Sequence, residues 1–282
     1  MASFLTLYLQ ILLFSVGPFL LPGLLVWLVR QIFVQLVGTR SGRPFLITLF
    51  ALSTPLREAA HVLSAVLFFQ RVEDVRFLDL RAHDGELGFT ERSYNPKNPL
   101  AVLGNFLYAL APVMLGLVAV LCVLLLFFGG AMENFFLELS ALGEEAGFTE
   151  HFRLAVRLLP SVFAASEVGL LSKIVGTALL LLLSMGLFIS LSELLEGFFG
   201  MILYALLAAL SAGALLLFDA RIQRVVTGDL RAFATGVLAL YLLVLAAVAA
   251  LLAFGVIFFI VRKLGAVPEA GNALTLYAKK EE

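Results

Sequence analysis

The sequence contains few charged residues for its length. Only 14% of its 282 residues are Asp, Glu, Lys or Arg, whereas 62% are hydrophobic, and the mean hydropathy is +1.05. A soluble globular domain usually has about 25% charged residues. So low a charge content excludes an ordinary soluble domain and indicates an integral membrane protein.

An excess of charge of either sign is also missing, because the formal net charge is -1 and basic residues are scattered among acidic ones. Proteins that bind nucleic acid usually gather Lys and Arg in a patch. We therefore expect no nucleic-acid partner, and we expect the lipid bilayer and other integral membrane proteins instead. The Lys and Arg residues divide equally between the two sets of loops, so they do not fix the membrane orientation.

Cysteine is nearly absent as well. Cys122 is the only one, so no disulfide can form within the chain. A single free cysteine in an apolar run is typical of an ordinary core or lipid-facing residue.

Long apolar runs are what the sequence has in abundance. A helix needs about 20 residues to cross about 30 Å of hydrocarbon. Six runs reach that length: Leu5–Val37, Phe45–Phe69, Leu100–Phe128, Leu170–Leu191, Phe198–Phe218 and Ala232–Val261. We predict an all-α integral membrane protein with about six transmembrane helices in one membrane domain, residues 1–282, with Pro18 and Pro22 kinking the first helix.

Three segments outside these runs have their own patterns. Residues 72–94 place short β-rich runs on either side of Asp84-Gly85, which predicts a β-hairpin. The hairpin either offers an edge strand to an extended peptide or packs over the rim of the helices. Residues 133–165 predict an amphipathic segment on the membrane surface, ended or bent at Pro160. Residues 268–282 form a polar tail.

The most informative motif lies inside the second run, where Arg57-Glu58-Ala59-Ala60-His61 places three ionisable side chains in apolar surroundings. Two His residues four apart on a helix can hold one zinc ion, and a Glu after the first His can activate the metal-bound water. Here Arg57 stands in the position of the first His, so a permanent cation replaces a neutral ligand. Because ionisable groups inside a membrane usually pair with one another, we expect Arg57 to contact Glu58, His61 or a partner on another helix.

A family resemblance is carried by Thr54 to His61, by the following hairpin and by Gly104-Asn105-Phe106 with Ala111-Pro112. These residues resemble bacterial membrane proteins related to the site-2 protease class of intramembrane zinc metalloproteases. The resemblance implies a multi-pass protein of the bacterial cytoplasmic membrane. It also implies that Glu58 matches the general base and His61 the second zinc ligand.

In that family a later helix supplies an Asp as the third ligand. The nearest match here is Leu195, and the carboxylates nearby are Glu193 and Glu196. Glu196 is the candidate replacement ligand, and its alternative interpretation is a carboxylate at a helix end. Asn105 belongs to the segment that carries the resemblance, so we expect it near Glu58 and His61 in one polar cluster with Arg57.

Three functions remain open from the sequence. The first, which we favour, is a non-catalytic, pseudo-protease-like subunit that binds or scaffolds a membrane complex and needs no cofactor. The second is an active intramembrane zinc metalloprotease in which Glu58 is catalytic and His61 and Glu196 bind the metal. The third is a transporter or channel subunit with an intramembrane polar relay.

Overall fold

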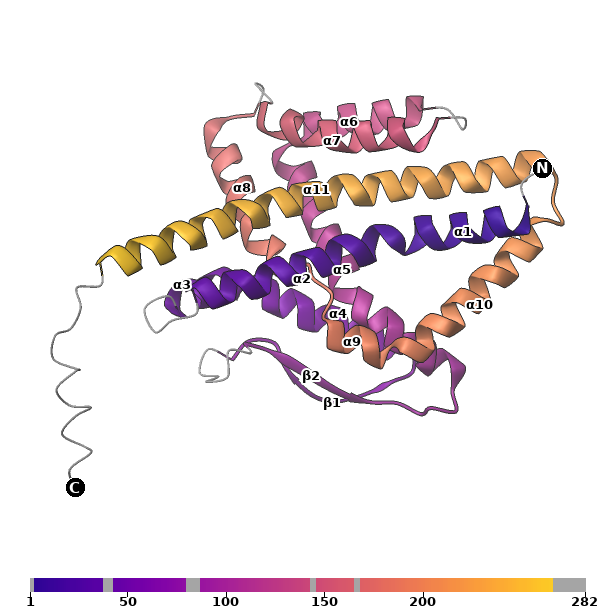
Figure 1. The fold of residues 1–282 in the computed structure, drawn as a ribbon, viewed down its shortest axis with the longest axis horizontal. Helices are drawn as coiled ribbons and strands as arrows, with labels where there is room; N and C mark the ends of the chain where they lie inside the picture. The colour runs from indigo at the N-terminus through magenta and orange to yellow at the C-terminus, as the bar shows by residue number, and fades with distance from the viewer. Residues whose placement is uncertain (1–2, 38–42, 80–86, 143–145, 165–167, 266–282) are drawn as a thin grey trace.

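The computed structural model describes residues 3–37, 43–79, 87–142, 146–164 and 168–265. Within these residues the protein is mostly helical and has one two-stranded sheet (Figure 1). The helices are α1 (Phe4–Ser15), α2 (Gly17–Val37), α3 (Arg43–Phe50), α4 (Ser53–Leu67), α5 (Pro99–Phe127), α6 (Gly129–Ala141), α7 (Phe148–Ala164), α8 (Leu170–Ser184), α9 (Leu191–Glu196), α10 (Phe198–Leu215) and α11 (Ala220–Gly265). The strands are β1 (Arg71–Arg76) and β2 (Phe89–Ser93).

Four of the described helices are long and apolar enough to cross a membrane: α2, α5, α10 and α11. Two further apolar helices, α1 and α8, are shorter. The structure therefore fits the predicted all-α membrane class, whereas the predicted count of six spans is not confirmed. The predicted runs at 100–128, 198–218 and 232–261 each fall within, or nearly coincide with, a single long helix.

The other three runs are broken, and proline explains two of the breaks. A proline ring clashes with the carbonyl four residues earlier, so a helix cannot easily continue into it. Pro18 lies in the first turn of α2, and α1 ends at Ser15, so the chain is divided there and not merely kinked. Pro55 lies in the first turn of α4 and separates it from α3, which leaves α4 with 15 residues.

The third broken run ends in a buried connection. Helix α8 stops at Ser184, and the next six residues reach α9 without regular structure. Leu187 and Ile189 in this connection are almost fully buried. The Ile189 amide donates to the Gly23 carbonyl over 3.2 Å, which ties the connection to α2.

The long helices do not form one parallel bundle. Figure 1 shows α1 and α2 following one another end to end alongside α11, whereas α5 crosses them steeply. Helix α11 has 46 residues, which at ~1.5 Å per residue gives a rod of about 70 Å. The Asp219 carboxylate caps its first turn by accepting from the Arg221 and Ile222 amides over 3.1 and 3.0 Å.

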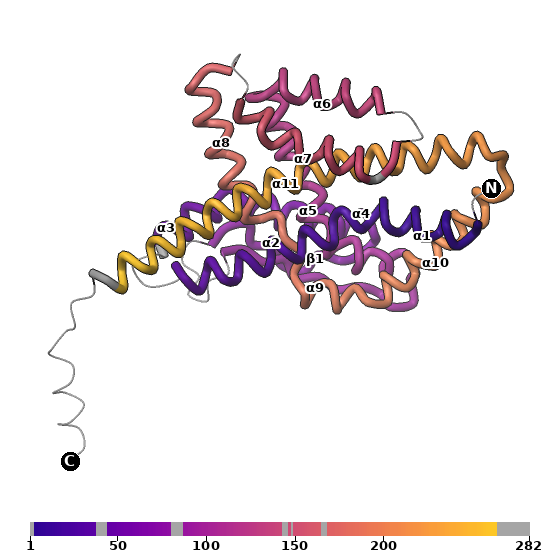
Figure 2. Tube along the Cα trace, turned by 45° about the horizontal axis from the view of Figure 1, so that its top comes forward, coloured from indigo at the N-terminus to yellow at the C-terminus, as the bar shows by residue number. Residues whose placement is uncertain are grey.

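Smaller elements cover two opposite sides of these helices (Figure 1), and Figure 2 shows α6 and α7 along one of these sides. On one side, the described part of the predicted segment 133–165 lies mostly in two helices, α6 and α7. Helix α7 continues through Pro160 to Ala164, so of the two predicted effects of Pro160 the ending of the helix is wrong. On the other side, β1 pairs antiparallel with β2 from Arg71–Ser93 to Arg76–Phe89, with a bulge at Val72 and Asp74. The Asp84-Gly85 turn and the tail at 268–282 lie outside the described residues.

Candidate functional site

Helix α4 carries the two side chains that the sequence singled out most strongly. Residues three apart on a helix share a face, so Glu58 and His61 both point into the protein, where they are 1% and 2% exposed. The Thr90 hydroxyl on β2 donates to Glu58 Oε2 over 2.8 Å. The hairpin therefore rests directly on the motif helix.

Arg57 is paired with carboxylates on both sides. Its Nη2 donates to Glu193 Oε1 on α9, and its Nη1 lies 3.6 Å from Glu58 Oε1. Its guanidinium also lies over the Phe188 ring at 4.8 Å. The expected Arg57–Glu58 contact is present, but the hydrogen-bonded partner comes from a helix about 136 residues further along the chain.

His61 faces the same carboxylate. Its Nε2 lies 3.6 Å from Glu193 Oε1, and its ring stacks on Tyr108 of α5 with centroids 4.1 Å apart. Glu193 belongs to helix α9, which lies outside the four candidate spans. Burial raises the pKa of the Glu193 carboxyl, and the Arg57 guanidinium acts against that rise.

This arrangement does not fit a zinc ion. A zinc site needs three or four neutral or anionic donors around one point. Here the Glu193 oxygen nearest to His61 already accepts from the Arg57 guanidinium, so a cation lies where a zinc motif of two His residues four apart would need its first imidazole. In the described part of the chain no three His, Cys, Asp or Glu side chains come together as a ligand set.

Glu196, the candidate replacement ligand, lies near Arg92 and is mostly exposed. Its side chain is 69% exposed, and Oε2 lies 3.9 Å from Arg92 Nη2. It belongs to the end of a short helix, as the alternative interpretation of the sequence supposed. Glu193 is the carboxylate of this pair that approaches His61.

A second polar group surrounds Asn105, which is 3% exposed on α5. Asn105 Oδ1 accepts from Gln70 Nε2 over 2.9 Å and from Arg92 Nη1. Gln70 also donates to the Ala101 carbonyl over 2.9 Å and accepts from Arg92 over 2.8 Å. Gln70 after the end of α4, Arg92 on β2 and Asn105 on α5 thus form one hydrogen-bonded group that joins these three elements.

Tyr108 connects this group with the motif helix. The Tyr108 ring stacks on His61, and the Arg92 guanidinium lies 3.8 Å from the centroid of the same ring. Its hydroxyl donates to the Thr90 carbonyl over 3.3 Å. The predicted cluster of Arg57, Glu58, His61 and Asn105 therefore exists as one neighbourhood, with Asn105 joined to the motif through Arg92 and Tyr108.

A tight helix end delivers Gln70 to this neighbourhood. The Gln70 amide donates to the Ala65 carbonyl over 2.8 Å, and the Phe69 amide donates to the Val66 carbonyl over 3.2 Å. This is a Schellman motif, whose turn residue adopts a left-handed conformation and is usually Gly. Here that residue is Phe69, with φ 57°.

Three glycines let the helices around the site approach closely. A Cβ on Gly104 of α5 would collide with Phe68 and lie 2.8 Å from Gln70 Nε2. A Cβ on Gly197 would lie 2.8 Å from Phe106 Cα, and one on Gly200 2.5 Å from the Val102 carbonyl oxygen. Small residues at such positions are typical of membrane helix contacts, and here they hold α9 and its carboxylates over α5.

The sequence did not identify Gln70, Thr90, Arg92 and Tyr108 as members of the site. For two of them a signal existed, because Thr90 and Arg92 are two apart on a predicted strand and so share a face. Gln70 and Tyr108 had no such signal, since their roles depend on how α4 and α5 pack. No family model, no curated protein and no solved structure matches this chain.

Proposed function

We propose that this protein is a non-catalytic, multi-pass membrane subunit that binds or scaffolds another integral membrane protein, in the cytoplasmic membrane of a bacterium. The observation that carries the proposal is the Arg57–Glu193 pair. It fills with a fixed cation the position where the resembled proteases hold their first zinc ligand. The motif helix then serves as architecture, and Glu58 anchors the hairpin through Thr90.

The packing of the site supports a structural use of these polar groups. Buried charged groups that are paired and hydrogen-bonded specify how elements fit together. Here they join α4, the hairpin and α5, which follow one another along the chain, to α9, which lies far from them in sequence.

The hairpin is the element through which we propose that a partner is recognised. Its first strand has no second neighbour among the described residues, so its outer edge is open. The bulge at Val72 and Asp74 and the charges of Arg71, Glu73 and Arg76 oppose indiscriminate strand pairing. A partner that adds there would need matching charges, which favours one specific peptide over many.

The zinc question is tested by restoring the motif. Arg57→His recreates two His residues four apart, so the purified variant is expected to gain zinc measurable by mass spectrometry of metals, whereas Arg57→Gln is not. The wild-type protein is expected to contain no stoichiometric zinc. Stoichiometric zinc in the wild-type protein that is lost in His61→Ala, or hydrolysis of a transmembrane peptide by the pure protein, would overturn the proposal in favour of the enzyme.

The binding role needs a separate measurement. A photo-reactive amino acid placed at Glu73 on the open strand edge is expected to cross-link one defined integral membrane protein in cells. The same partner should be recovered at an equal yield from Glu58→Gln, which keeps an acceptor for Thr90. Partner loss in Glu58→Gln with the fold intact would mean that the carboxylate acts directly.

A further inference from the structure

The first strand of the hairpin carries charges in a fixed order. Its four charged side chains are exposed and its two valines are half-buried, in the order Arg71-Val72-Glu73-Asp74-Val75-Arg76. Figure 1 shows β1 on the outer side of the strand pair, and no further strand lies beside it among the described residues. A segment that pairs with this edge is favoured if it places cations opposite the two acidic residues and none opposite the two arginines.

Asp74 makes the demand for a cation sharper. Its carboxylate accepts from the Val75 amide over 2.8 Å. An incoming strand that competes for this amide leaves the carboxylate without its donor, so the strand must supply a charged donor in exchange. The best partner for this edge therefore has a Lys or Arg directly opposite Asp74.

The sequence beyond α11 contains a segment with complementary charges. This tail segment, residues 276–282, reads Leu276-Tyr277-Ala278-Lys279-Lys280-Glu281-Glu282. An antiparallel alignment gives each charged side chain of β1 a favourable partner. The pairs are Glu282 with Arg71, Lys280 with Glu73, Lys279 with Asp74, and the Tyr277 ring with Arg76. The same charges also match in a parallel alignment, so the direction must follow from where the tail segment starts.

The end of α11 lies near the far end of the hairpin, and this sets the direction. Leu87, two residues before β2, is buried in one cluster with Leu251 of α11, and Phe258 of α11 packs against that cluster. Helix α11 ends at Gly265, about 10 Å beyond Phe258 at ~1.5 Å per residue. The ten residues 266–275 can then span up to about 33 Å. A chain that enters at this end and follows β1 runs against it, which selects the antiparallel alignment.

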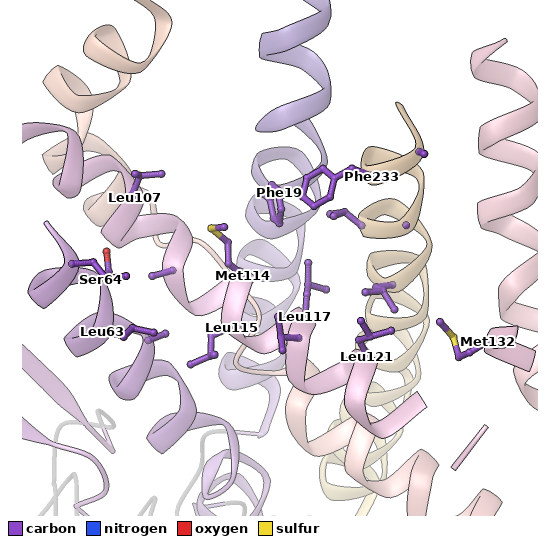
Figure 3. Close-up of a pocket in the computed structure, with 18 of the residues that line it drawn as sticks. Phe19, Leu63, Ser64, Leu107, Met114, Leu115, Leu117, Leu121, Met132 and Phe233 are labelled. Carbon is purple, nitrogen blue, oxygen red and sulfur yellow. The ribbon is translucent and has the colours of Figure 1, made fainter. Parts of the chain in front are cut away.

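Two alternative arrangements fit less well. The apolar pocket on the other side of α4 from the polar cluster, where Figure 3 shows Leu63 and Met114, has no charged residue in its lining. The lysines and glutamates of the tail segment would lose water there without gaining a partner. Two β1 strands from two copies of the chain would, in the register that pairs all six residues, set arginine opposite arginine and acid opposite acid. Like charges directly opposite each other disfavour that pairing.

We propose that the tail segment adds to the open edge of β1 as a third, antiparallel strand of the same chain, and so occupies the edge on which a partner would pair. Glu73 and Asp74 recognise the two lysines. The strand addition does not depend on the binding role proposed above, and only its consequence for a partner rests on that role. The hairpin is then closed by its own chain until a better-matched strand displaces the tail segment.

Engineered disulfides test the register. In a Cys122→Ser background, Val75→Cys with Ala278→Cys leaves all the charges in place and sets the two thiols opposite each other, at the ~4.4–6.8 Å between Cα atoms that a disulfide needs. The control is Val75→Cys with Leu274→Cys, four residues out of register. In nanodiscs, mild oxidation should join the first pair at least about tenfold faster, since a strand holds the control thiols about 13 Å apart. Equal rates would mean that the tail only collides with the hairpin, and would overturn the proposal.

Charge exchange tests what recognises the tail segment. Lys279→Glu with Lys280→Glu should slow formation of the in-register disulfide by about fivefold or more, because like charges then face each other. Adding Glu73→Lys with Asp74→Lys should restore the rate. A rate that the first pair of substitutions leaves unchanged, or that the second pair does not restore, would overturn the assigned ion pairs.

Two further measurements separate the source of the strand from its consequence. A disulfide that forms only between a Val75→Cys protein and an Ala278→Cys protein in a mixture would overturn the assignment to the same chain. Deleting the tail segment should raise several-fold the cross-linking of a partner by a photo-reactive amino acid at Phe77, which leaves the four charges of β1 intact. If the disulfide forms in register but the deletion changes nothing, the strand addition stands and the binding role of this edge fails.

Discussion

The two faces of α4 differ more than any other neighbouring regions of the molecule. One face presents Glu58 and His61 to partners on β2, α5 and α9, whereas the other presents Ala60 and Ser64 to an apolar pocket. The polar face is buried and holds paired charges, whereas Leu63 and Leu67 on the pocket face are 51% and 62% exposed. The comparison teaches that in this helix the polar face fixes neighbouring elements, whereas the apolar face borders an open pocket.

The largest effect is expected from removing the central cation. Arg57→Met leaves Glu58 and Glu193 close together without their guanidinium. Breaking a buried pair in this way typically costs about 3–5 kcal/mol, and because the Arg57 and Glu193 side chains are partly buried, at 21% and 18% exposed, we expect a loss at the lower end of that range. The double variant Arg57→Met, Glu193→Met should recover most of that loss, since an apolar pair of similar volume is often neutral. Unfolding in detergent, followed by circular dichroism, measures the free energy in both.

The matched control for this prediction is an exposed ion pair. Arg157 lies 3.9 Å from Glu138, and both side chains are more than half exposed. Arg157→Met should therefore change the free energy of unfolding by less than about 1 kcal/mol. If Arg57→Met costs no more than this control, the polar face of α4 does not hold the elements together.

A smaller loss is expected at Arg92, whose side chain is 9% exposed. Arg92→Lys keeps the charge but loses the planar fork that reaches Gln70 and Asn105 and lies over Tyr108. We expect a loss of about 1–3 kcal/mol in the same unfolding experiment. Arg76→Lys is the control, because the Arg76 side chain is 57% exposed. A change in the free energy of unfolding above about 0.5 kcal/mol in this control would contradict the expected difference between the two arginines.

The sequence predicted one face of α4 better than the other. Charged residues in an apolar run are rare enough that Arg57, Glu58 and His61 had to have partners, and the distance between them on a helix follows from its period. Their strongest partner, Glu193, follows only from the packing of α9 over α5, which Gly197 and Gly200 permit. No local pattern contains that information.

The pocket face was not predictable from the sequence at all. Ala60 and Ser64 look like ordinary residues of an apolar helix, and a cavity depends on the separation of several helices. The predicted count of six spans is not confirmed for a similar reason, because hydropathy does not register where Pro18 and Pro55 interrupt a continuous apolar run. The antiparallel strand pair and the long helices were predicted from the sequence because alternation in strands and long apolar runs in helices are local, repeated patterns.

The smallest effect, and one of opposite sign, is expected at the turn that brings Gln70 to the polar face. A left-handed conformation costs an ordinary residue about 1–2 kcal/mol, whereas Gly tolerates it but loses more backbone entropy on folding. Phe69 has φ 57° and is 71% exposed, so it loses little packing on replacement. Phe69→Gly should stabilise the protein by roughly 0.5–1 kcal/mol.

The neighbouring residue provides the contrast for this last prediction. Leu67 is also mostly exposed, at 62%, but it has an ordinary helical position at the end of α4. Leu67→Gly should therefore destabilise the protein by up to about 1 kcal/mol, in the same detergent experiment. If both glycine substitutions shift the unfolding midpoint in the same direction, the backbone at Phe69 does not carry the cost assigned to it, and the position of Gln70 must be set by its side-chain partners alone.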